Sequence, residues 1–173
     1  MAGHSSALLA AVLPHYDLIV CAARTAAEEA AHYGGFHVGA AMRVIMPSGG
    51  YKVFKGGNQK PSPDVKKICA ERVAIDRART AGAVRVEVVV VTGKLKRDDE
   101  SGQMGETLHP CGVCRDEVLT DPLIQDDTLI ITVLHANDGS IPSADLAGVK
   151  IELHTRGSLW SFHGDHAHHT HGH

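Results

Sequence analysis

The sequence has no excess of basic residues and no long apolar run, and its N-terminus is not expected to be a secretion signal. It carries 17 Lys and Arg residues against 20 Asp and Glu residues, and its formal charge of -3 gives no basic footprint for a polynucleotide. No stretch approaches the ~18 uninterrupted apolar residues of a membrane helix. The short apolar run over residues 7–13 has no Lys or Arg before it and is ended by Pro14, which argues against a signal peptide. We therefore expect a soluble, cytoplasmic protein with no nucleic acid or membrane partner.

Cysteine is also scarce, and the positions of the few that occur are informative. Only four are present, in a chain that is expected to lack a secretion signal. In a reducing compartment, clustered thiols more often bind metal or take part in chemistry than form disulfides. Cys21 lies among alanines and is expected to be a core residue. The other three, Cys69, Cys111 and Cys114, lie near predicted helix starts and are candidates for a functional site.

The length and composition suit one domain. With 173 residues, of which 43% are hydrophobic and 21% charged, the chain is long enough for one hydrophobic core and too short for two good ones. Its last eleven residues, 163–173, contain six histidines among Gly and polar residues and cannot bury enough apolar area to order themselves. We predict a single domain over residues 1–158 and a flexible His-rich tail over residues 159–173.

Hydrophobic periodicity predicts helices and strands in alternation. An Ala-rich segment predicts a helix over residues 5–33, and apolar segments on either side of a Pro-Ser-Gly-Gly turn predict a hairpin. Two glycines and two prolines in residues 56–63 predict a loop, because they disfavour both a ladder and a helix. The other predicted elements are a helix over 69–81, a buried strand over 84–92, an exposed loop over 93–109, a helix that ends at 119, and strands over 128–134 and 149–154. This order indicates a mixed α/β layering of helices around one sheet.

A Cys-x-x-Cys pair follows Pro110 at the start of a predicted helix. Helix N-termini favour the thiolate that binds metal, but Cys111 and Cys114 supply only two of the ligands that zinc requires. Cys69 also opens a predicted helix and is the third candidate. Three protein ligands leave the fourth tetrahedral position for water, as in catalytic zinc sites, whereas a structural site is normally closed by a fourth Cys or His. The alternatives are buried structural thiols or a redox Cys-x-x-Cys pair, and the redox interpretation leaves Cys69 and Glu71 unexplained.

A carboxylate follows Cys69 by two residues. Glu71 is close enough to reach a metal-bound water without being a ligand, which is the arrangement of zinc deaminases. In these enzymes the activated water attacks the amidine carbon and the glutamate relays protons. A glutamate in a first helical turn can also be present only because the helix dipole favours it. Arg72 could bond to thiolate sulfur and offset the net negative charge of three thiolates on Zn²⁺.

These segments together resemble the small homo-oligomeric cytidine deaminases. The resemblance is carried by Phe36-His37-Val38-Gly39-Ala40-Ala41, by Gly57-Asn58, by Cys69-Ala70-Glu71-Arg72-Val73-Ala74 and by Pro110-Cys111-Gly112-Val113-Cys114-Arg115. It implies an α/β fold, a three-layer α/β/α arrangement with a five-stranded mixed sheet, assembled as a homotetramer or, alternatively, a dimer. It also implies one Zn²⁺ per subunit on Cys69, Cys111 and Cys114, with Glu71 as the catalytic acid and base.

The resemblance extends to the substrate contacts. It implies that Phe36 lies against the base, that Asn58 hydrogen-bonds the ribose, and that the backbone near Ala70 contacts the substrate. It implies a supporting place beside the metal for Arg72 and Pro110. From the residues alone, Phe36 could equally be a core aromatic, and Asn58 could be an ordinary turn residue.

The sequence departs from the family pattern in two places. Typical members have a Glu two residues after the ribose-loop Asn, where this chain has Lys60, which donates hydrogen bonds and cannot accept them. Lys60 could favour a substrate with a carboxylate or phosphate, or could be an exposed loop cation. The usual C-terminal segment that covers the substrate is not recognisable, and Asp116 replaces a usual Gln.

The sequence therefore predicts a zinc-dependent hydrolytic deaminase that converts cytidine, deoxycytidine or a related aminopyrimidine into the oxo product and ammonia, as in pyrimidine salvage. The departures leave open the same chemistry on another amino-heterocycle or on a nucleoside antibiotic such as blasticidin S. A non-catalytic zinc-binding protein is a further possibility, against which the presence of Glu71 argues.

Overall fold

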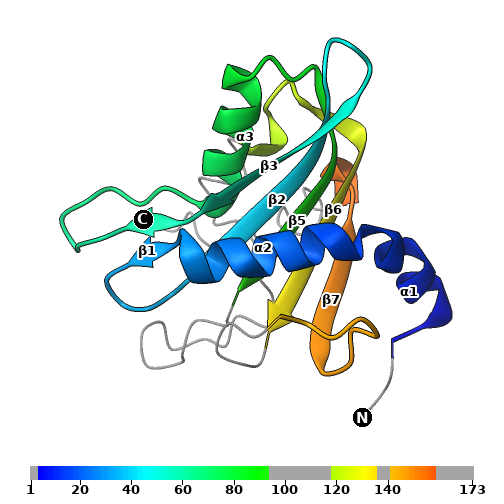
Figure 1. Cartoon of the computed structure of the whole chain (residues 1–173), viewed down its shortest axis with the longest axis horizontal. Coiled ribbons are helices and arrows are strands. Elements are labelled where there is room, and N and C mark those ends of the chain that lie inside the picture. The colour runs from blue at the N-terminus through cyan, green and yellow to red at the C-terminus, as the bar shows by residue number, and fades with distance from the viewer. Residues whose placement is uncertain (1–3, 94–117, 136–140, 159–173) are drawn as a thin grey trace, which may run out of the picture.

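The computed structural model describes residues 4–93, 118–135 and 141–158, and its centre is a five-stranded sheet (Figure 1). The strand order is β3-β2-β5-β6-β7. β5 and β6 are parallel, and the other neighbours, β2 with β3, β2 with β5 and β6 with β7, are antiparallel. The strands are β2 (Val38–Ile45), β3 (Tyr51–Gly57), β5 (Arg85–Gly93), β6 (Ile124–His135) and β7 (Val149–His154). The sheet is therefore mixed, as predicted.

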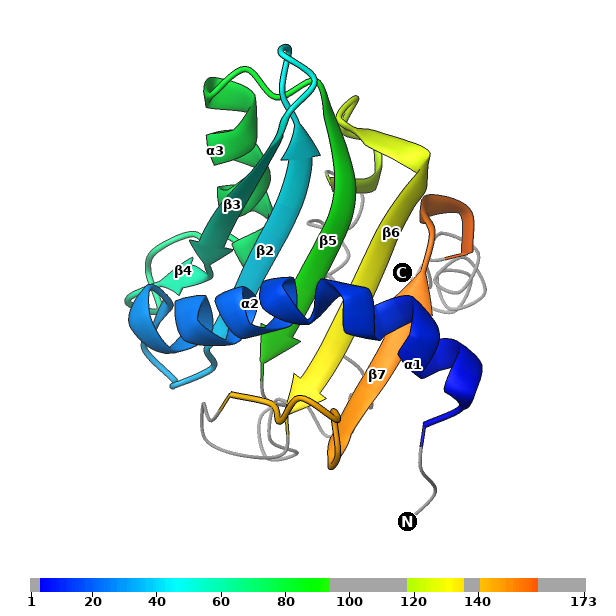
Figure 2. The ribbon, with the colours of Figure 1, turned by 45° about the vertical axis from the view of Figure 1, so that its right-hand side comes forward.

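Helices cover both faces of this sheet. Figure 2 shows α2 (Tyr16–Glu28) crossing one face, while α3 (Ala70–Thr80) lies on the opposite face beside β3. Two separate clusters of buried side chains correspond to the two faces, one around Ala74 and Ile75 of α3 and one around Leu18 and Ile19 of α2. This confirms the predicted three-layer α/β/α fold with a five-stranded mixed sheet.

The valines of β5 are divided between the two cores. Val89 and Val91 belong to the cluster on the α3 side, and Val88 and Val90 belong to the cluster on the α2 side. Side chains alternate between faces along a strand, so a run of valines suits a strand that is buried on both sides. The prediction of a doubly covered strand at residues 84–92 is thereby confirmed.

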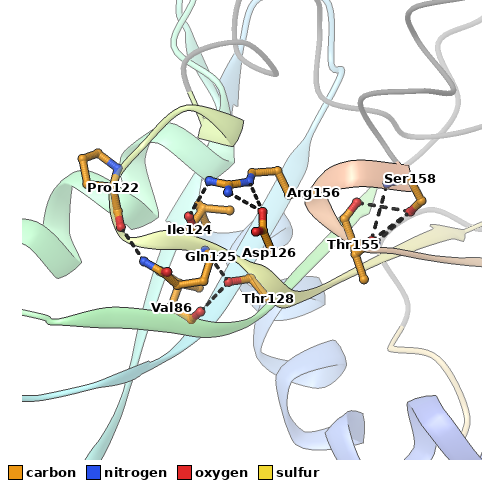
Figure 3. Close-up of polar contacts among 9 residues, drawn as sticks. All are labelled: Val86, Pro122, Ile124, Gln125, Asp126, Thr128, Thr155, Arg156 and Ser158. Atoms are coloured by element: carbon orange, nitrogen blue, oxygen red, sulfur yellow. Dashed lines mark hydrogen bonds and ion pairs between the residues drawn. The ribbon is translucent and has the colours of Figure 1, made fainter.

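The alternation is interrupted near Val86, where the strand pairing is irregular. The register of β5 with β6 passes from Val86↔Ile124 to Val88↔Leu129, so four residues of β6 lie opposite one residue of β5. The buried hydroxyl of Thr128 holds this bulge, because it donates to the Val86 carbonyl (2.7 Å) and accepts from the Gln125 amide (2.9 Å) (Figure 3). A second buried hydroxyl, that of Thr92, donates to the Val133 carbonyl at 2.9 Å. Both hydroxyls thus bridge β5 and β6.

The predicted single helix over residues 5–33 was wrong in its continuity and its end. The segment forms α1 (Ser6–Val12), a 3-10 turn η1 (Leu13–His15) and α2, which ends at Glu28. Pro14 lies in the 3-10 turn, because a proline cannot supply the N–H that a continuous α-helix needs. After α2 the chain forms the short strand β1 (Ala31–His32).

By length and composition, the helical segment Ser6–Glu28 could cross a membrane. This differs from the expectation that no segment of the chain resembles a membrane helix. Core helices of globular proteins and signal sequences meet the same criterion. The buried residues of α2 pack against the sheet, among them Leu18, Ile19 and Ala22.

The predicted loop over residues 56–63 was partly wrong. β3 continues through Gly56 and Gly57, and Gln59–Lys60 form the short strand β4, which pairs in parallel with β1. Glycine occurs here because the helices lie directly on the strands. A Cβ on Gly56 would lie 2.7 Å from the Ala74 amide nitrogen of α3, and one on Gly57 would lie 2.5 Å from the Ala30 nitrogen.

Gly39 of β2 is packed just as tightly. It pairs with Gly57, and a Cβ on Gly39 would lie 2.0 Å from the Ala22 carbonyl oxygen and 2.6 Å from the Ala26 nitrogen. These atoms are helix backbone and cannot turn aside as a side chain could. The three glycines therefore set how closely α2 and α3 approach the sheet.

We predict that Gly39→Ala lowers the free energy of unfolding by on the order of 3 kcal/mol, because α2 must move away from β2. Gly50→Ala is the matched control, since its new methyl group would make only ordinary contact, 3.6 Å from the Ser48 hydroxyl. Urea denaturation of the two variants measures the difference. Equal stabilities would contradict the close packing described here.

Candidate active site

The start of α3 brings Cys69 and Glu71 together in the protein interior. Cys69 is the N-cap residue of α3, with extended backbone angles, and its carbonyl accepts the first helical hydrogen bond from Val73 (3.2 Å). The exposed fraction is 6% for Cys69 and 4% for Glu71. Ala70, between them, is buried at 1%. A helix begins here because Cys69 ends an extended segment and Ala, Glu and Arg, which are good helix formers, follow.

Burial raises the pKa of the Glu71 carboxyl above its ordinary value of 4.5. A hydrogen bond from its own backbone N–H and the positive charge of Lys67 oppose this rise. A carboxyl group with a raised pKa holds and releases protons more readily near neutral pH than an exposed one. Such a group is suited to general acid and base catalysis.

The segment that leads into Cys69 is fixed by Gln59. Gln59 and Ile68 form an antiparallel bridge, in which the Gln59 N–H donates to the Ile68 carbonyl (2.8 Å) and the Ile68 N–H donates to the Gln59 carbonyl (2.9 Å). The Gln59 side-chain amide also donates to the carbonyls of Glu29 (2.9 Å) and Gly57 (3.2 Å). The residue before Cys69 is thereby tied to the end of α2.

Asn58 is buried, with an exposed fraction of 3%, and its carboxamide joins two backbone groups. The side-chain oxygen accepts from the Val38 N–H (2.9 Å), and the side-chain nitrogen donates to the Phe36 carbonyl (2.7 Å). Through these two hydrogen bonds, Asn58 fixes the start of β2 and the backbone of Phe36, the residue that is predicted to lie against the base. Phe36 itself is half-buried and packs against the core on the α3 side.

The Lys60 ammonium group is directed to its own loop. It donates to the carbonyls of Pro63 (3.2 Å) and Val65 (2.7 Å), and lies 5.9 Å from the centre of the Tyr33 ring. Lys60 thus stabilises the turn after β4 through hydrogen bonds that were not predicted from the sequence.

The other predicted site residues are placed only in part. Arg72 lies in the first turn of α3 and forms an ion pair with Asp76, with 4.0 Å between Nε and Oδ2. Cys111, Cys114 and Pro110 lie outside the described residues. Within residues 4–93, 118–135 and 141–158, no three His, Cys, Asp or Glu side chains come together as a metal-binding group. Cys69 is therefore the one predicted zinc ligand that this part of the chain contains.

His32 and Gln59 organise the site, although neither was singled out from the sequence. Both act through hydrogen bonds to backbone groups, and their partners are defined only once the chain is folded. A weak signal exists for His32, because it directly precedes a turn that contains two consecutive glycines, Gly34 and Gly35. Gln59 carries no such signal.

Comparison with known proteins identifies the family of the chain. Residues 15–121 match the sequence model of the family described as the cytidine and deoxycytidylate deaminase zinc-binding region. The chain belongs to this deaminase family. It is thus a zinc-dependent hydrolytic deaminase that cleaves a C–N bond of a small-molecule substrate, and the suspected family is confirmed.

Several solved structures are similar to this deaminase. The cytidine deaminase from Burkholderia pseudomallei is 24% identical, with a TM-score of 0.57 over 84% of this chain and 94% of that chain, and it shares the fold. The cytidine deaminase from Mycobacterium tuberculosis is 24% identical (TM-score 0.48, 66% of this chain and 80% of that chain). The cytidine deaminase from Mycobacterium leprae is 21% identical (TM-score 0.48, 78% and 90%). Among curated proteins, no sequence matches this deaminase.

We predict that burial of Glu71 makes the zinc-free deaminase less stable as pH rises. A carboxyl group with a raised pKa binds its proton more tightly in the folded than in the unfolded state, so the free energy of unfolding falls between the unfolded and the folded pKa. Below pH 4.5 Glu71 is protonated in both the folded and the unfolded state, so its contribution to stability no longer changes with pH. Glu71→Gln has no such proton, so the variant should gain stability relative to the wild type from pH 4.5 to pH 8 in urea denaturation. A constant difference across this range would show that the carboxyl group is not desolvated.

Proposed function

We propose that this chain converts cytidine, deoxycytidine or a related aminopyrimidine into the oxo product and ammonia. The observation that carries the proposal is the buried pair Cys69 and Glu71 at the start of α3, in a chain of the deaminase family. A buried carboxylate without a function would cost stability. The position of Glu71 two residues after Cys69, at a helix N-terminus, supports a catalytic role for this carboxylate.

The zinc site is proposed to consist of Cys69, Cys111 and Cys114, with one ion per chain. The structure places the Cys69 sulfur in a disulfide bond, and the reduced side chain, buried at the N-terminal end of α3, would be available as a zinc ligand. Zinc, when bound, supplies the Lewis acid that activates water for attack. Arg72, in the first turn of α3, and Pro110 are proposed to support the ligands.

Glu71 is the proposed proton carrier. It accepts one proton from the attacking water and delivers it to the ring nitrogen, then accepts the second proton from the newly added hydroxyl group and delivers it to the amino group, so that the C=O bond forms, the C–N bond breaks and ammonia leaves. The raised pKa of its carboxyl group supports this role, since the group must be protonated and deprotonated within each turnover.

Three further residues are proposed to contact the substrate. Phe36 lies against the base, Asn58 reaches the sugar, and the backbone near Ala70 contacts the ring. The hydrogen bonds between Asn58 and the Phe36 and Val38 backbone support a common site, since they hold the first two of these residues together. Gly56, which contacts Ala70 and Ala74, keeps the start of α3 close to β3.

A second candidate is deamination of a non-standard amino-heterocycle or of a nucleoside antibiotic such as blasticidin S. The observation that favours it is Lys60, which stands where a carboxylate acceptor is expected. Its ammonium group donates to Pro63 and Val65 and offers no acceptor to a sugar hydroxyl. A substrate with a carboxylate or phosphate would suit this cation better.

Ammonia release from a panel of substrates tests the proposal. We expect the zinc-loaded protein to deaminate cytidine and deoxycytidine, and expect Glu71→Gln to lower kcat by ~10²–10⁴ while zinc content is kept, because only proton transfer is removed. Turnover of only cytosine, blasticidin S or an acidic analogue would replace the first candidate by the second. Full turnover in Glu71→Gln would overturn the mechanism.

We also propose that the enzyme is a cytoplasmic homotetramer that serves pyrimidine salvage, with a dimer as the alternative assembly. The proposal rests on the resemblance to the small cytidine deaminases, which are homo-oligomeric. Light scattering on the purified protein should give four times the mass of one chain. The mass of a single chain would overturn the proposal of an oligomer, and recovery of the native protein in a membrane fraction would overturn the cytoplasmic location.

A further inference from the structure

The turn between β1 and β2 is organised around the side chain of His32. Its Nδ1 atom lies 2.9 Å from the Gly34 amide nitrogen and 3.4 Å from the Phe36 amide nitrogen. Both neighbours are N–H donors, so Nδ1 must carry the lone pair and the ring proton lies on Nε2. The turn is closed further by the Gly35 N–H, which donates to the His32 carbonyl at 3.0 Å. One acceptor atom thus binds two amides of the same turn.

The imidazole ring also contacts two aromatic rings. It stacks on Tyr33, with 5.0 Å between ring centres, and meets Phe36 edge to face, with 5.8 Å between centres. The backbone of His32 is held by β4, since His32 pairs with Lys60 and the Tyr33 N–H donates to the Lys60 carbonyl (2.9 Å). The ring is therefore anchored to a part of the molecule that does not belong to the turn itself.

The backbone of Phe36 is consequently held at both its N–H and its carbonyl group. Its N–H donates to His32, and its carbonyl accepts from the Asn58 side chain at 2.7 Å. The two glycines before it, Gly34 and Gly35, are exposed, and Gly35 has a positive φ of 74°. Glycine gives the backbone more freedom than any other residue, so the turn would not hold Phe36 in place without added contacts. His32 supplies those on the N-terminal side.

We propose that His32 is a positioning residue for substrate binding, which acts through Phe36 by accepting hydrogen bonds at Nδ1. The inference rests on the proposed function, in which Phe36 lies against the base. A ring fixed before the substrate arrives loses less conformational entropy on binding, so the contribution of His32 is to substrate affinity. It makes no contribution to proton transfer at Glu71, which lies on α3.

Two substitutions separate the contribution of the Nδ1 acceptor from that of the aromatic ring. His32→Phe keeps an aromatic ring beside Tyr33 and Phe36 and removes the acceptor. His32→Asn removes the ring and keeps an acceptor at the position of Nδ1, since an Asn side chain readily accepts from the amide two residues later. The two variants therefore have opposite expected effects.

We expect His32→Phe to raise KM for cytidine about tenfold, the value of one to two lost hydrogen bonds, with kcat changed by less than about twofold. If only blasticidin S is turned over, the same shift is expected in its KM. His32→Asn should recover most of the loss. Hydrogen exchange of the zinc-loaded proteins is the second measurement, in which the Gly34 and Phe36 amides should exchange about tenfold faster in His32→Phe and near the wild-type rate in His32→Asn.

The outcomes are distinct. Unchanged exchange in His32→Phe would overturn the role of Nδ1 as the anchor of the turn, whether or not the protein is active. Faster exchange with an unchanged KM would overturn the link between the turn and substrate binding. Equal losses in both variants would also overturn the proposal, because the ring and not the acceptor would then be responsible. If the wild type deaminates no compound of the panel, the proposed function fails, and the exchange rates still decide whether His32 anchors Phe36.

Discussion

The near contact between glycine backbone and helix backbone is the constraint on which the site depends. Gly39 lies against Ala22 and Ala26 of α2, Gly57 lies against Ala30 just after α2, and Gly56 lies against the first turns of α3. A side chain at Gly56 would have to push α3 away from β3, and Cys69 and Glu71 would move with α3. The deaminase site is therefore defined by the absence of side chains on two strands as much as by the residues that carry the chemistry.

Much of the fold could be predicted from local patterns. The valine run of β5, the hairpin turn between β2 and β3 and the period of α3 each reflect a single dominant effect, and the strand and helix types were correct. The errors occurred where two effects compete. Gly56 and Gly57 are poor strand residues by propensity, yet they lie in the ladder because only glycine fits beneath the helices. Pro14 interrupts a sequence that is otherwise continuously helical in composition.

The chemistry of the site was easier to predict than its support. Cys69 and Glu71 stand in a sequence pattern typical of zinc deaminases, and the structure places them together at a helix start. The zinc ligand set itself is a proposal, because Cys111 and Cys114 lie outside the described residues. His32, Asn58 and Gln59 bind backbone amides and carbonyls that are distant in sequence or ordinary in type. Any Asn or Gln could make such bonds, so their partners cannot be deduced from residue identity. Long-range hydrogen bonds to main chain leave no signature in composition or periodicity.

The bulge between β5 and β6 has a consequence for how the central strand is aligned. Val86, Val88, Val89, Val90 and Val91 are chemically identical, so shifting β5 by one residue would still present valines to both cores. Apolar patterning is therefore silent about alignment in the middle of the sheet. The two buried threonine hydroxyls do distinguish one alignment, because the Thr128 hydroxyl donates to the Val86 carbonyl (Figure 3) and the Thr92 hydroxyl donates to the Val133 carbonyl. In this protein two hydroxyl groups therefore fix the register of β5 against β6, which the valine side chains alone would leave undefined.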